Sequence, residues 1–149
     1  MAESIAHADR RPPGVLGHRI YSALLPASIT CFIGALITDI TYSRSPDMMW
    51  LDFSSWLLLA GLVVGGAAGV VLIVETIRSR ARRKGSWAAH ALLFVAAWVV
   101  EVLNSFVHTR DGWTAVVPTG LMLSILAVVL ALLAGWFWQS ANRRVAGDL

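Results

Sequence analysis

Four long apolar segments constrain this chain more than any other feature of its sequence. They cover about residues 20–42, 53–77, 87–107 and 113–138. Each is near or above the roughly 20 residues that an α-helix needs to cross the hydrocarbon of a bilayer. None shows the polar face of a helix that lies flat on a membrane. Because helices satisfy their own backbone hydrogen bonds inside lipid, the sequence predicts four transmembrane helices.

The composition agrees with this fold class. Of the 149 residues, 57% are apolar and 14% are charged, whereas soluble domains are nearer half apolar and about a quarter charged. The links between the apolar segments are short, which favours antiparallel neighbours. We therefore expect an all-α, up-down four-helix membrane bundle over residues 18–138. A polar N-terminal arm at 1–17 and a polar tail at 139–149 would flank it.

Basic residues are concentrated on one side of the predicted bundle. Ten lie in the N-terminal arm, in the link between the second and third helices, and in the tail; the other two are Arg44 and Arg110. Cytoplasmic links of membrane proteins carry an excess of Lys and Arg, so both termini are predicted to be cytoplasmic. This bias already explains the basic link, and we expect no binding of nucleic acid.

The third predicted helix carries the most informative polar residues. At 100° per residue they fall on one stripe of the helix, which comprises His90, Glu101, Asn104 and His108, with Ala97 among them. Ionisable groups in lipid are costly and face the interior of a bundle, so this stripe is expected to point inward. We also expect an ion pair between Asp39, near the end of the first helix, and Arg110.

The second predicted helix contains Gly61, Gly65 and Gly69, which form two overlapping GxxxG steps. Small residues at this spacing let two helix backbones approach closely and pack. The partner of this glycine face stays open between another helix of the same bundle and a helix of a second subunit.

Two histidines suggest a cofactor hypothesis. His18 precedes the first predicted helix and His90 lies one turn into the third, so both would lie at the same depth of the membrane. Two histidines on different helices can ligate one haem b iron. The alternative is that each is an interfacial polar residue with a backbone or carboxylate partner. No other metal site is expected.

Several residues along the chain match the motifs of one family, and they are Gly17, His18, Pro26, Asp39, His90, Arg110, Gly135 and Trp136. By these residues the chain, over roughly 17–138, resembles the small bacterial predicted membrane proteins grouped as domain of unknown function 2231. It departs from them at Tyr21, where the family has a second histidine, and at Phe94, where the family has an asparagine. It also lacks the two early prolines of the family's first motif, in the region 17–22. The resemblance implies a four-helix fold in the bacterial inner membrane and implies little about biochemistry.

The sequence is compatible with three functions. No HExxH, GxSxG, P-loop or GxGxxG motif occurs, so we expect no catalytic residues and no enzyme. The first interpretation is an accessory or structural subunit of a larger membrane complex, in contact with lipid and with other subunits or further copies. The alternatives are an electron-transfer protein with haem bound by His18 and His90, and an oligomeric proton or small-solute pathway along the Glu101 stripe.

Overall fold

Four long helices make up most of the protein. The computed structural model describes residues 15–78, 85–109 and 116–147. The elements are α1 (Val15–Arg44), α2 (Met48–Arg78), α3 (Ser86–His108), a π-helical turn η2 (Val116–Gly120) and α4 (Leu121–Gly147). All four long helices are apolar enough and long enough to cross a membrane. The predicted class, an all-α membrane bundle of four helices, is confirmed.

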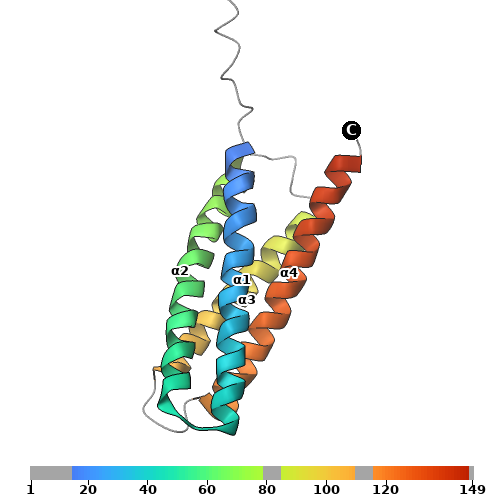
Figure 1. The fold of residues 1–149 in the computed structure, drawn as a ribbon. Helices are drawn as coiled ribbons and strands as arrows, with labels where there is room; N and C mark the ends of the chain where they lie inside the picture. Colours follow the sequence, from blue (N-terminus) through green and yellow to red (C-terminus); the bar gives the residue numbers. More distant parts are fainter. Residues whose placement is uncertain (1–14, 79–84, 110–115, 148–149) are drawn as a thin grey trace, which may run out of the picture.

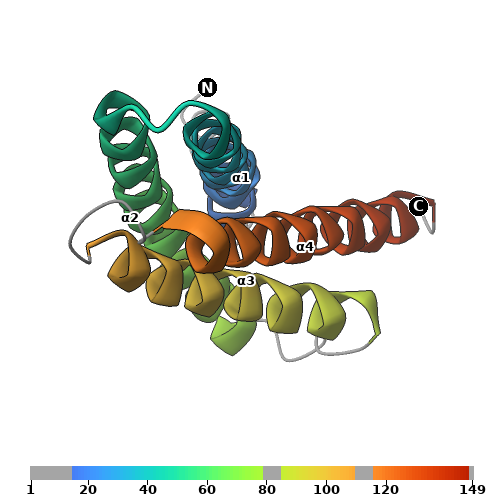
Figure 2. The same cartoon turned by 90° about the horizontal axis from the view of Figure 1, so that it is seen from below.

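The helices are arranged as two antiparallel pairs. α1 packs most extensively on α2, and α3 on α4. Figure 2 shows that the α1–α2 pair and the α3–α4 pair cross each other at an angle. We call the end at which α1 and α3 finish the hairpin end. The opposite end, where α1 starts and α4 finishes, is the terminal end (Figure 1).

The observed helices extend beyond the apolar segments. α1 begins at Val15, so His18 lies inside the helix and not before it, and α4 continues past Trp138 to Gly147. α2 begins at Met48, because the Asp47 carboxylate accepts a hydrogen bond of 2.9 Å from the Met49 N–H and caps the helix. Hydropathy marks the part of a helix that meets lipid, whereas capping groups mark where it ends.

The start of the fourth helix also differs from the prediction. α4 begins at Leu121, after the η2 turn, and not near 113. Val117 has φ −112° and ψ 125°, the extended conformation that a residue before proline favours because the ring of Pro118 crowds a helical one. The proline therefore lies within η2, and the regular helix begins only after this turn, at Leu121.

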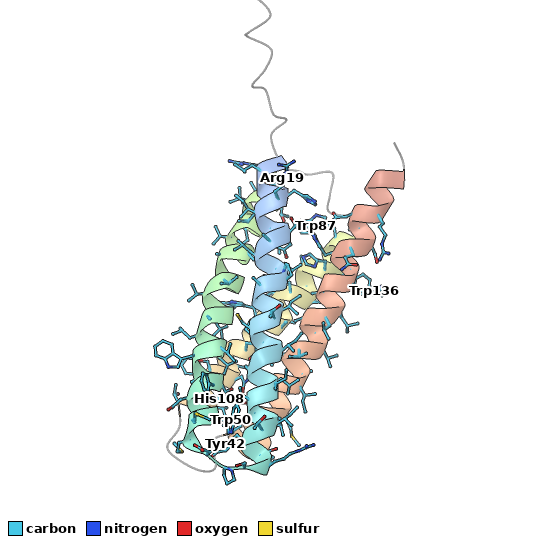
Figure 3. The ribbon with its side chains drawn as sticks, in the orientation of Figure 1. Arg19, Tyr42, Trp50, Trp87, His108 and Trp136 are labelled. Carbon is cyan, nitrogen blue, oxygen red and sulfur yellow. The ribbon has the colours of Figure 1, made fainter. Side chains whose placement is uncertain are left out.

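Buried side chains form four successive layers along the bundle. From the terminal end, the aromatic layer contains Tyr21, Trp87, His90, Phe94 and Trp138. The middle apolar layer contains Phe32, Ala35, Leu58 and Val128. The polar layer contains Asp39, Ser54, Glu101, Asn104, His108 and Ser124. The end layer contains Tyr42, Leu51 and Val116 at the hairpin end. Figure 3 shows Tyr42 and His108 near the hairpin end and Trp87 toward the terminal end.

The glycine face of α2 packs inside this bundle. A Cβ added to Gly61 would lie 2.5 Å from the Phe32 Cε1 atom of α1, and one added to Gly69 would lie 3.6 Å from the Phe94 Cε1 atom of α3. Gly65 faces both α1 and α3. Of the two partners left open by the sequence, the structure places helices of the same chain on all three glycines.

Two hydrogen bonds accompany this close approach. The Ser28 hydroxyl of α1 donates to the Gly61 carbonyl oxygen at 3.0 Å. The Trp98 indole N–H of α3 donates to the Leu62 carbonyl oxygen at 3.1 Å. Side chains from both neighbours therefore reach the α2 backbone, which requires small residues at the contact.

We predict that Gly61→Ala destabilises the bundle, whereas Gly66→Ala does not. The new methyl group at position 61 would overlap the Phe32 ring, while the nearest atom at position 66 is 3.9 Å away. Overpacking of this kind costs about 1–3 kcal/mol. Unfolding of both variants in the same detergent measures the difference. Equal stability of the two variants would contradict the assigned packing.

Candidate functional site

The polar layer is the strongest candidate for a functional site. Its six side chains have between 0% and 6% of their surface exposed, and they come from all four long helices. Asp39 lies on α1, Ser54 on α2 and Ser124 on α4, while α3 supplies the other three. Polar and ionisable groups inside a membrane are costly and mark functional positions by default. How they are satisfied decides what the layer can do.

The Asp39 carboxylate is the centre of the polar layer. Its Oδ1 atom accepts a hydrogen bond of 2.5 Å from the Ser54 hydroxyl and lies 3.0 Å from the His108 Nε2 atom. Its Oδ2 atom accepts a hydrogen bond of 2.5 Å from the Ser124 hydroxyl. One carboxylate on α1 is thus bound from each of the other three helices.

The hydrogen bonds of His108 show how many protons this pair holds. His108 Nδ1 lies 3.0 Å from the Asn104 carbonyl oxygen. A carbonyl oxygen only accepts, so Nδ1 must carry a hydrogen. The Nε2–Oδ1 contact with Asp39 then contains one shared proton, on either the imidazole or the carboxyl group. In both arrangements the pair has no net charge.

A directed chain of hydrogen bonds connects Glu101 to Asp39. The Asn104 amide Nδ2 donates to Glu101 Oε2 at 3.1 Å and to the Ser124 hydroxyl at 2.8 Å. Because Ser124 accepts that bond, its own hydrogen is free to bind Asp39. Glu101 Oε1 and Asn104 Oδ1 are buried and have no hydrogen-bond partner among the described residues.

The predicted stripe of α3 is found in the interior, divided between two layers. Glu101, Asn104 and His108 lie in the polar layer, and His90 lies in the aromatic layer. Between them along α3 lies Ala97, which is also buried. The other expected partner of Asp39, Arg110, lies outside the described residues, so that ion pair stays a prediction.

His90 has no free ring nitrogen. Its Nδ1 atom lies 2.8 Å from the Ala134 carbonyl oxygen and must donate to it. Its Nε2 atom then accepts the Tyr21 hydroxyl at 2.6 Å. His18 packs on the Trp138 ring, with centroids 5.1 Å apart. Axial ligation of haem iron needs an unoccupied nitrogen lone pair, so for His90 the geometry favours the alternative, a histidine with a backbone partner.

Sequence reasoning missed the partners of these groups. Ser54, Ser124 and Tyr21 lie within the apolar segments, and each bonds an ionisable side chain of another helix. The only signal is a single hydroxyl at the depth of a charged residue on a neighbouring helix.

We predict that Asp39→Ala destabilises the protein far more than Asp52→Ala. The first variant removes the carboxylate that binds Ser54, Ser124 and His108, and removing one partner of a buried pair costs about 3–5 kcal/mol. Asp52 is exposed, and such surface changes stay within about 0.5 kcal/mol. Unfolding in detergent compares the two. A loss as small for Asp39→Ala as for Asp52→Ala would show that the polar layer does not hold the bundle together.

Comparison with known proteins identifies the family. The family model DUF2231, described as a predicted membrane protein, matches residues 17–145. An uncharacterized signaling protein of Caulobacter vibrioides is 28% identical over 125 residues, which cover 84% of this chain and 12% of that protein. The chain therefore spans a small part of that relative's length. No solved structure matches this chain. As its resemblance predicted, the chain belongs to the DUF2231 family of membrane proteins.

Proposed function

We propose that this chain is a non-catalytic membrane module that acts as an accessory subunit of a signalling assembly. The observation that carries the proposal is the polar layer, which joins all four helices and is closed on both sides. The middle apolar layer separates it from the terminal end, and the end layer covers it at the hairpin end. A closed network links helix positions to one another, and its described side chains, at most 6% exposed, offer little surface to a substrate.

The same geometry weighs against a pathway through a single chain. A proton or solute route along the α3 stripe would need polar groups between Glu101 and His90. Ala97, an apolar residue that is 2% exposed, lies between them on α3. The middle apolar layer, whose Phe32 and Leu58 are 3% and 1% exposed, lies between the polar layer and the aromatic layer. The layers therefore support a role in helix packing over a role in transport.

The comparison with the Caulobacter protein supports the signalling context. A segment similar to this chain makes up 12% of a protein that is named a signaling protein, as expected of a module that works with other domains. A polar network that binds four helices together also couples them, because a shift of one helix changes the bonds to the other three. Coupling of this kind requires an element with alternative arrangements, and the helix pairs around Asp39 are our candidate.

We further propose that the module lies in the bacterial inner membrane with both termini in the cytoplasm. Within the described helices, Arg19, Arg78 and Arg143 lie at the terminal end and Arg44 at the hairpin end. This distribution follows the bias of cytoplasmic links toward positive charge.

We predict opposite thiol accessibility at the two ends of the bundle. In a Cys31→Ser background, Ser45→Cys at the hairpin end should react with a membrane-impermeant maleimide in cells with a permeabilised outer membrane. Gln139→Cys at the terminal end should react only after lysis. Both positions are exposed. Labelling of Gln139→Cys before lysis, with Ser45→Cys protected, would reverse the proposed orientation.

We predict that one lipid-facing surface contacts a partner protein. A photo-crosslinking amino acid at Ile37, Val63, Leu92 or Leu132 probes one exposed position on each long helix. At Leu58, which is 1% exposed, it serves as the buried control. Irradiation of host cells should give a protein adduct, identified by mass spectrometry as carrying a soluble signalling domain, from one or two of these helices and none from Leu58.

The opposing result is equally specific. If all four exposed positions capture lipid alone, and the purified chain raises proton flux in liposomes, the accessory role is wrong. Glu101→Gln is the matched variant for the flux measurement, because the pathway alternative places Glu101 on the route.

A further inference from the structure

Among the described residues, Glu101 is the ionisable group of the polar layer that has no partner of opposite charge to itself. Its side chain is fully buried. Asn104 provides a single hydrogen bond to Oε2, and Oε1 has no partner among the described residues. An ionised carboxylate in an apolar interior needs an opposite charge or several donors. The described surroundings of Glu101 supply one neutral donor.

The other titratable side chains of the polar layer supply no net positive charge to Glu101. Among the described members of the polar layer, α1 contributes Asp39 and α3 contributes His108. The members from α2 and α4 are serines, which carry no charge. Asp39 and His108 share one proton and have no net charge together. Counted over the described residues, the layer would therefore hold one uncompensated negative charge if Glu101 were ionised.

We propose that Glu101 is a proton-binding site of the folded protein, and that its proton locks the polar layer in the closed arrangement. The hydrogen-bond geometry fits a carboxylic acid, in which Oε2 is the carbonyl oxygen that accepts from Asn104 and Oε1 carries the proton. Release of that proton places a second carboxylate charge in the layer that holds Asp39. The charge is relieved when the helices separate at the hairpin end and admit water.

This site is independent of the proposed signalling role. In this proposal Glu101 holds a proton, and loss of this proton weakens helix packing. This applies whether the partner of the chain is a signalling protein or another copy of the chain. The consequence is a four-helix contact that is stable while Glu101 is protonated and weakens as the pH rises through its titration. Asp39 stays bound by its three helices as long as the layer is closed.

Infrared spectroscopy of the purified protein in lipid nanodiscs tests the proton directly. At neutral pH the wild type should show the C=O stretching band of a protonated carboxyl group, and the band should shift in protein grown with carboxyl-¹³C glutamate. It should vanish in Glu101→Gln and persist in Glu75→Gln, the matched control at the other buried glutamate. Absence of the band from the wild type, or its loss in Glu75→Gln, would overturn the proposal even if Glu101→Gln failed to fold.

The pH dependence of unfolding tests the lock. The wild-type midpoint should fall as the pH is raised through the range in which the infrared band disappears. In Glu101→Gln, whose amide cannot lose a proton, this fall should be absent. Glu75→Gln should follow the wild type. The same fall in all three proteins would show that the proton on Glu101 does not hold the layer closed.

Discussion

The burial of the Asp39 carboxylate is the constraint on which the rest of the structure depends. A charged group in hydrocarbon has no water to bind, so its partners must come from the protein. Asp39 takes them from Ser54, His108 and Ser124, one on each of the other helices. That requirement fixes the rotation and the depth of every helix at the hairpin end. The crossing of the two helix pairs (Figure 2) therefore leaves the polar layer intact while the helices are free to diverge elsewhere.

The membrane architecture could be predicted from the sequence because lipid acts on long segments. Four apolar runs of sufficient length leave few alternatives, and the observed spans agree with them. The residues at which the helices begin could not be predicted from hydropathy. Asp47 starts α2 by capping its first turn, and Val117 delays α4 through its extended backbone. Both effects depend on one or two residues, which a hydropathy average does not detect.

Only half of the candidate site could be predicted, for a physical reason. Positions on one helix are related by 100° per residue, so the stripe of α3 follows from its spacing. The partners on other helices depend on how far each helix slides along its neighbour. That offset is set by packing contacts such as Gly61 against Phe32 and Ser28 against the α2 backbone. Ser54 and Ser124 could not be recognised as ligands of Asp39 before this register was known.

Two of the departures from the family motifs, Tyr21 and Phe94, fall in the same contact cluster. Tyr21 donates its hydroxyl hydrogen to His90, and the Phe94 ring lies 6.2 Å from both of these rings. The Tyr21 hydroxyl supplies the hydrogen that His90 Nε2 accepts. The Phe94 ring packs edge-on against the Tyr21 ring, so that both side chains contribute apolar surface to this layer. Both changes therefore affect the aromatic layer, which the middle apolar layer separates from Asp39. Because of that separation, the terminal end can vary in chemistry while the polar layer keeps its hydrogen bonds.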